Sequence, residues 1–160
     1  MQRGPGSPRG SGAGHLAFLL AQVGAHAAAR FAERLAPLGL APQHAGILRV
    51  LGQAAGQSQR ALSERLGVLP SRLVALVDDL EARGLVERRD DADDRRSYAL
   101  HLTPRGREAL EEIGRVARAH GDALCAALTE PERAQLAALL GRIAEDQGLL
   151  PGVHPGLRRP

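Results

Sequence analysis

The basic side chains of this sequence lie where they could bind a polyanion. Arg72 falls in the first turn of a helix expected to begin at Pro70-Ser71, and Arg95 and Arg96 follow a run of carboxylates. All 21 basic residues are Arg, and a guanidinium pairs bidentately with phosphate oxygens or with the edge of guanine. These residue types predict phosphate and base recognition.

Side chains that could support catalysis or hold a metal are scattered. The six His residues form no i, i+4 pair and no Cys/His cluster, so we expect no metal and no cofactor. No nucleophile–base pair or phosphate-binding loop is visible, which argues against an enzyme.

His26 and His120 are expected at an interface or on a polar face, and His101 in a structural role. Cys125 is expected to be a small buried thiol and not an oxidation sensor, because no Arg or His adjoins it.

Length and composition favour a single helical domain. The chain has 160 residues, 44% hydrophobic and only 2% aromatic, so its core must consist of Leu, Ala, Val and Ile. The net charge is +3, and residues 57–107 carry ten Arg against nine acidic residues. The placement of the arginines therefore matters more than the net charge. A single Cys excludes an intrachain disulfide. The sequence has no apolar run of membrane-spanning length and no signal peptide, so we expect a soluble cytoplasmic protein.

Gly- and Pro-rich segments at 1–14 and 148–160 are expected to be disordered tails that flank one folded domain over 15–147. Apolar residues at three- and four-residue spacing predict amphipathic helices at about 15–36, 104–128 and from 130 onward. Thr103-Pro104 and Thr129-Glu130-Pro131-Glu132 are N-terminal capping signals.

The middle of the chain has a distinctive order of short elements. A helix from Pro42 is followed by a short helix capped by Ser58, a stop at Gly67 and a helix from Pro70 to Arg83-Gly84. A strand at 85–88, a charged tip and a partner strand at 98–102 complete the order. The sequence therefore predicts a mainly α protein with a small β-hairpin wing, namely a winged helix-turn-helix over about 42–103. This module binds DNA by placing one helix in the major groove.

Within this module, the candidate DNA-binding residues lie at the two helix starts, on the exposed side of the second helix and at the hairpin tip. Helix N-termini suit phosphate binding, Arg72 suits guanine, and Asp94 is expected to position the tip arginines. The full set is Ser58, Gln59, Arg60, Ser71, Arg72, Ala75, Asp94, Arg95 and Arg96.

The segment from Asp94 to Thr103 follows the pattern D-x-R-x5-L-T, and Leu80-Glu81-Ala82-Arg83-Gly84-Leu85-Val86-Glu87-Arg88 precedes it. Together these motifs resemble the multiple-antibiotic-resistance regulator (MarR) family of transcription factors over about residues 15–147. The resemblance implies a homodimer formed through the helices at 15–36 and 104–147, a pseudo-palindromic double-stranded DNA operator and a small-molecule effector. Where many members carry a Thr-Arg pair in the recognition helix, this sequence has Val74-Ala75, so we expect a methyl contact from Ala75 to thymine.

The resemblance favours a DNA-binding regulator, most often a repressor. Broad apolar stripes on the outer helices independently predict a dimer seam, because one lobe cannot cover them. For an effector we expect a phenolic or aromatic acid in a pocket walled by Phe18, Val23 and Ile47. A winged-helix protein–protein module without DNA binding remains the alternative, because the predicted hairpin tip is acidic.

Overall fold

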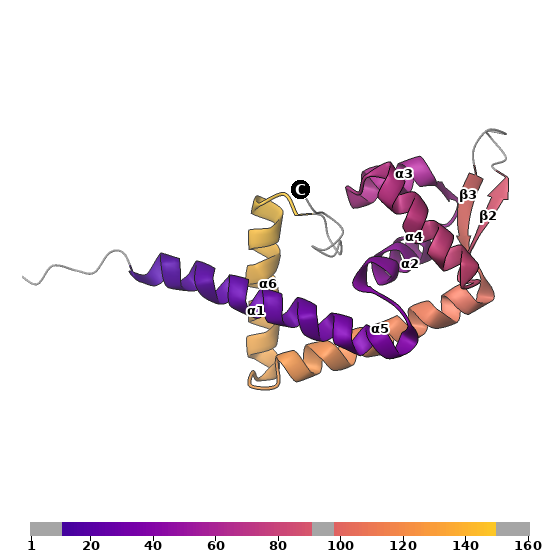
Figure 1. Ribbon diagram of the computed structural model, residues 1–160. Helices are drawn as coiled ribbons and strands as arrows, with labels where there is room; N and C mark the ends of the chain where they lie inside the picture. The colour runs from indigo at the N-terminus through magenta and orange to yellow at the C-terminus, as the bar shows by residue number, and fades with distance from the viewer. Residues whose placement is uncertain (1–10, 91–97, 150–160) are drawn as a thin grey trace, which may run out of the picture.

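The computed structural model describes residues 11–90 and 98–149, which form a mainly helical chain with one small sheet (Figure 1). In chain order the elements are α1 (Ser11–Leu35), η1 (Ala36–Leu38), α2 (Pro42–Gln53), β1 (Gln57–Ser58), α3 (Gln59–Leu66), α4 (Pro70–Ala82), β2 (Val86–Asp90), β3 (Tyr98–Leu102), α5 (Pro104–Leu124) and α6 (Glu130–Asp146). The predicted winged helix-turn-helix is confirmed. None of the helices in these ranges is long and apolar enough to cross a membrane.

A hydrophobic core occupies residues 35–102, which we call the lobe. Leu48, Leu62, Leu80 and Leu100 are fully buried there, each from a different element. Ile113 closes the core from α5. As expected from the composition, the buried cluster contains only aliphatic side chains. The apolar sides of the helices and strands of the lobe meet in this cluster.

The sheet is antiparallel in the order β1-β3-β2. Val86 pairs with Leu102 and Asp90 with Tyr98, as expected for the two strands of a wing. The third strand, β1, was not predicted, because two residues carry no periodicity; Gln57 pairs with Leu100 and Ser58 with Ala99. This strand ties the start of α3 to the hairpin.

The predicted capping signals are confirmed by hydrogen bonds. The Ser58 hydroxyl accepts from the backbone N–H of Ala61 at 3.1 Å, and the Thr103 hydroxyl accepts from that of Gly106 at 2.9 Å. Before α6, the Glu132 carboxylate accepts from the Thr129 N–H at 2.8 Å. Such local bonds fix where helices begin because they satisfy otherwise unpaired N–H groups.

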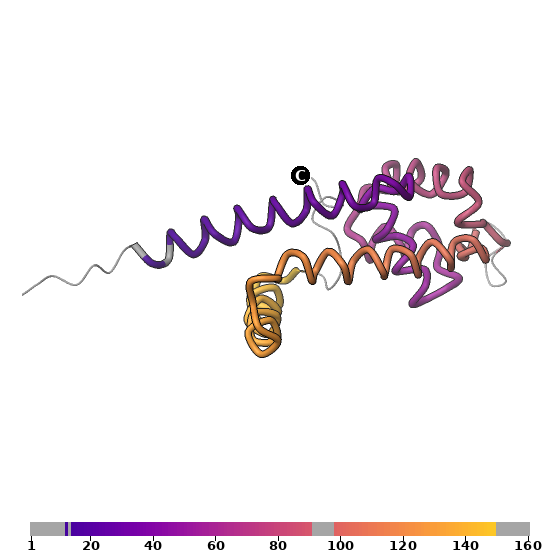
Figure 2. Tube along the Cα trace, turned by 90° about the horizontal axis from the view of Figure 1, so that it is seen from below, coloured from indigo at the N-terminus to yellow at the C-terminus, as the bar shows by residue number. Residues whose placement is uncertain are grey.

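Helices α1, α5 and α6 extend from the lobe, and we call them the base. In Figures 1 and 2, α5 runs from the hairpin beside the C-terminal half of α1, and α6 turns away at the end of α5. The N-terminal half of α1 and all of α6 contain no buried residue in the described chain. Their apolar side chains remain open, as Leu16 at 56% and Leu139 at 46% exposure illustrate.

Several boundaries differ from the sequence expectation. Helix α1 begins at Ser11 and not at 15, so residues 11–14, expected in the N-terminal tail, are helical. Helix α5 ends at Leu124 and not near 128. Cys125 follows it as a half-buried residue, which corrects the expected buried thiol.

Candidate nucleic-acid interface

The turn between α3 and α4 is set by a buried hydroxyl. Ser63 donates from its Oγ to the carbonyl of Val68 at 2.6 Å, and the Val68 N–H returns a bond to the Ser63 carbonyl at 3.1 Å. Gly67 adopts φ +62°, which suits glycine. These contacts fix how α4 leaves the turn.

Helix α4 presents one side to the core and another to solvent. Leu73 and Val77 are buried, whereas Ser71 and Ala75 are exposed and Val74 is 42% exposed. This exposed face is the surface that a recognition helix would offer to a DNA groove.

Arg72 does not share that face fully. It is half-buried and already takes part in an interaction within the described chain. The structure thus brings Ser71 and Ala75 together on the open face of α4 and places Arg72 at its edge.

The three candidates near the start of α3 differ in availability. Ser58 uses its hydroxyl to cap α3, and Arg60 is exposed and pairs with Glu64 at 3.0 Å. The side-chain nitrogen Nε2 of Gln59 is enclosed and has no hydrogen-bond partner among the described residues. Of the three, Arg60 is the one with a solvent-facing cationic group.

Arg88, which sequence reasoning missed, ties α4 to the hairpin. Its guanidinium on β2 forms ion pairs with Asp78 and Glu81 of α4, and its side chain is only 18% exposed. Burial alone would lower the pKa of Arg88, but its hydrogen bonds and charge interactions with Asp78 and Glu81 raise the pKa overall. Carboxylates three residues apart on a helix, followed by an Arg on the next strand, were the available sequence signal.

A second network joins α4 to α2. The side chain of Asp79 lies 3.2 Å from Nε2 of His44 and 2.9 Å from Nε of Arg83. A second nitrogen of Arg83, Nη1, donates to the carbonyl of Gly39 at 2.7 Å. Nδ1 of His44 accepts from the Ala41 N–H at 3.1 Å. Burial lowers the pKa of His44, Asp79 opposes this effect and Arg83 adds to it, so the environment favours the neutral imidazole.

The hairpin-tip candidates Asp94, Arg95 and Arg96 lie outside the described residues. Their assigned roles in DNA binding therefore remain predictions.

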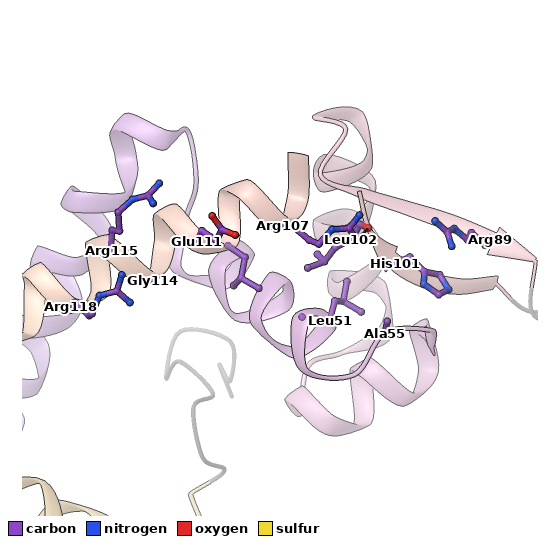
Figure 3. A pocket seen from close by; sticks show the side chains of 12 residues that line it. Leu51, Ala55, Arg89, His101, Leu102, Arg107, Glu111, Gly114, Arg115 and Arg118 are labelled. Carbon is purple, nitrogen blue, oxygen red and sulfur yellow. Dashed lines mark hydrogen bonds between the residues drawn. The ribbon is translucent and has the colours of Figure 1, made fainter. Parts of the chain in front are cut away.

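A groove of about 710 Å³ lies between α2, α5 and the hairpin (Figure 3). Arg89 and His101 lie toward its hairpin end, and Arg115 and Arg118 lie toward the other end of the α5 segment. Its apolar part is formed by Leu51, Ala55, Leu102 and Leu110. An apolar surface lined with several guanidinium groups suits an amphipathic anion.

The three residues expected to wall an effector pocket do not come together. Ile47 is fully buried in the lobe, whereas Phe18 and Val23 are 62% and 52% exposed on α1. Ile47 faces inward because α2 packs its apolar stripe against the core. The groove residues on α5 were missed, although those that line it from Arg107 to Arg118 recur at three- and four-residue spacing and so share one face of the helix.

A family model described as the MarR family matches residues 38–97. The HTH-type transcriptional repressor Rv2887 of Mycobacterium tuberculosis is 31% identical over 131 residues, which cover 82% of this chain and 94% of the repressor. A Thauera aromatica protein, named as a candidate transcriptional regulatory protein for the hcr operon, is 36% identical over 84% of this chain and 81% of its own length.

Solved structures of similar proteins have the same fold. The transcriptional repressor CouR, bound to a 23-mer DNA duplex, is 31% identical and matches with a TM-score of 0.74 over 88% of this chain and 99% of its own. Rv2887 in complex with DNA matches at 30% identity with a TM-score of 0.71, over 80% of this chain and 96% of that one. Rv2887 has also been solved in complex with p-aminosalicylic acid and with salicylic acid.

Proposed function

This chain belongs to the MarR family, and from that premise we propose that it is a homodimeric, sequence-specific DNA-binding repressor of transcription without catalytic activity. The observation that carries the proposal is the exposed face of α4, which contains Ser71, Val74 and Ala75. Relatives of 30% and 31% identity with this fold have been solved on DNA.

In this proposal α4 enters the major groove and the helix starts contact phosphate. Ser71 and Ala75 face the bases, with the Ala75 methyl group against thymine, while Arg72 contacts the edge of the site. Arg60 supplies a phosphate contact once it leaves Glu64. The Arg88 ion pairs with Asp78 and Glu81 hold α4 at a fixed angle to the hairpin, so that both can reach one DNA face.

The open base supports the dimer. Leu16 and Leu20 of α1 and Leu136 and Ile143 of α6 line one wide apolar groove of about 900 Å³. A second copy would bury this surface and place two α4 helices roughly 34–36 Å apart, one DNA turn, on a pseudo-palindromic operator.

We place the effector in the groove between α2, α5 and the hairpin. An aromatic acid would lay its ring on Leu51 and Leu110 and direct its carboxylate to Arg107 or Arg118. Arg115 is engaged by Glu112, which leaves it a weaker candidate. A ligand wedged between α2 and α5 would change how the lobe sits on the base and thereby the distance between the two α4 helices.

The DNA test uses fluorescence anisotropy with the intergenic DNA upstream of the protein's own gene, at two salt concentrations and with excess random competitor. Ala75→Glu should weaken binding at least about tenfold because it places a carboxylate against the DNA. Ala82→Glu is the matched control, since it adds the same charge at the exposed far end of α4. Absence of wild-type binding at low salt would instead favour a protein–protein module.

Salicylate is the probe for the groove. It should release the DNA from wild-type protein at lower concentrations than from Arg118→Gln, because the variant removes a carboxylate partner. Arg105→Gln, on the same helix outside the groove, should respond like wild type. If all three proteins release DNA at the same salicylate concentration, the groove is not the effector site, and the proposal that the protein binds DNA is unaffected.

A further inference from the structure

A third, smaller cavity of about 160 Å³ lies between α1 and α5 and shares no lining residue with the salicylate groove or the apolar groove of the base. His26, Arg30 and Arg34 of α1 line one side, and His120 of α5 lies opposite. The three α1 side chains are spaced four residues apart and therefore project from one face of the helix. Both views show the two helices running side by side here (Figures 1 and 2).

The residues that line this cavity include four nitrogen-bearing side chains and no carboxylate. Arg30 pairs with Glu33 at 2.7 Å, and Arg34 has no hydrogen-bond acceptor among the described residues. The nearby acid of α5, Asp122, is engaged by Arg133 at 3.2 Å. Arg34 therefore brings a positive charge to the cavity that no acidic group lining it offsets.

The lining groups influence one another electrostatically. Burial lowers the pKa of His120. Arg34 and His26 lower it further, because positive charge close to the imidazole disfavours its protonated form. The His120 ring is also held in place by Phe31, whose centroid lies 5.5 Å away. A fixed imidazole with guanidinium neighbours is arranged to donate hydrogen bonds to an anion.

We propose that this cavity binds a small oxyanion, of the size of sulfate or phosphate, between Arg34 on α1 and His120 on α5, with His26 as a further donor and Arg30 as another through the N–H groups that Glu33 leaves open. Its volume lies below the range of about 300–1,000 Å³ that is usual for larger organic ligands. The four donors come from two helices, so a tetrahedral anion could bond to both at once, whereas a single water could not offset the charge.

The bound anion would link α1 to α5 within the base. Because it offsets the positive field, it would raise the pKa of His120 and so bind more tightly as the pH falls. The charged groups that face His120 are His26, Arg30 and Arg34 of α1, with Glu33 reached through Arg30. This site is separate from the α4 surface and the salicylate groove, so its test needs no DNA.

The experiment follows the histidine imidazole signals of the full-length protein by NMR during titration with sodium sulfate, at ionic strength held constant with sodium chloride. Sulfate is chosen because it does not itself titrate near neutral pH. We expect saturable shifts at His26 and His120, an unchanged signal from His44, which is buried in the lobe, and a higher pKa of His120 in saturating sulfate.

Arg34→Gln should weaken sulfate binding about tenfold or more, since it removes a charge-assisted donor. Arg105→Gln removes an equal charge from α5 outside the cavity and should leave the affinity within about twofold of wild type. Sulfate should also raise the melting temperature of wild type more than that of Arg34→Gln.

Shifts that grow linearly without saturation, or that are equal in wild type and Arg34→Gln, would overturn the site and indicate general ion screening. A His120 pKa that is already high without sulfate, and that sulfate does not change, would also overturn it. That outcome would show that the positive charge around His120 is already offset without an anion.

Discussion

The lobe and the base use the same aliphatic side chains with opposite results. In the lobe, Leu48 and Leu62 are fully buried because helices and strands surround them on all sides. In the base, Leu16 of α1 and Leu139 of α6 remain about half exposed, because no further element of the described chain lies against them. The lobe therefore closes its own core, whereas the base presents a surface that another molecule must cover.

Polar contacts follow the same division. The lobe is held by contacts between elements distant in the sequence, such as Arg83 to the carbonyl of Gly39, 44 residues apart. In the base, side-chain pairs are mostly local, as in Arg30 with Glu33 and Arg115 with Glu112. Contacts between distant segments thus hold the elements of the lobe to one another, whereas most side-chain pairs of the base join residues of the same helix.

The largest contrast is expected between matched leucine truncations. Leu48→Ala should lower the free energy of unfolding by about 3 kcal/mol, because it leaves a cavity in a closed core. Leu139→Ala should cost less and should act mainly through the dimer, so its effect should grow at low protein concentration. Urea denaturation at several concentrations measures both. A concentration-independent loss for Leu139→Ala, equal to that for Leu48→Ala, would break the comparison.

Two glycines of α5 offer a matched pair across the boundary between lobe and base. A Cβ at Gly106 would overlap the backbone carbonyl of Leu85, so Gly106→Ala should destabilise by about 2 kcal/mol. At Gly121 a Cβ meets nothing within 4 Å, so Gly121→Ala should stabilise the helix by about 0.5–1 kcal/mol. Thermal unfolding distinguishes the two signs, and a destabilised Gly121→Ala dimer would indicate that a second copy packs there.

Loss of the Thr103 hydroxyl should cost more stability than loss of the Thr129 hydroxyl, because only Thr103 connects the lobe to a helix of the base. The hydroxyl of Thr103 donates to the carbonyl of Gly84 at 2.6 Å and accepts from Gly106, so it joins the lobe to α5. Thr103→Val should cost about 1–2 kcal/mol. The hydroxyl of Thr129 donates at 2.8 Å to the exposed carboxylate of Glu132, three residues away on the same helix, so Thr129→Val should cost less. Equal losses in chemical denaturation would contradict the idea that only the first cap spans two regions.

The smallest effect should be a pH dependence that comes from the lobe. The pKa of His44 is lowered in the folded protein, so below about 6.5 the unfolded chain binds a proton at this residue first. The contribution of His44 is thus fully present above that pH and is lost as the pH falls toward its folded pKa. Denaturation curves of wild type and His44→Gln from pH 5 to 8 should converge at low pH. Parallel curves would exclude this role.

Much of the lobe could be predicted because its signals are local. The caps at Ser58 and Thr103 and the stop at Gly67 depend on neighbours within a few residues, and the strand at 98–102 pairs with the strand that precedes it in the chain. Helical periodicity predicted that Leu73, Leu76, Val77 and Leu80 face inward. Leu73, Val77 and Leu80 are buried as predicted. The open face of α4 follows from the same periodicity.

The candidate site could be predicted only in part. The sequence pattern could not show that the side chain of Ile47 is fully buried in the core and therefore does not line an effector pocket. Nor could it show that Arg72 is half-buried, or that the Nε2 nitrogen of Gln59 is enclosed. Each depends on how one element packs against another, and a single helix pattern does not contain that information.

The sequence by itself determined where most of the helices begin and which side of each is apolar, since helical hydrogen bonds and capping act over three or four residues. Only the tertiary structure decided which charges are already paired. Arg88 is held by Asp78 and Glu81, whereas Arg34 meets His120 across a cavity, yet all are ordinary charged residues in the sequence. The difference arises because an ion pair or an anion site needs groups within a few ångströms, and packing between elements alone sets that distance.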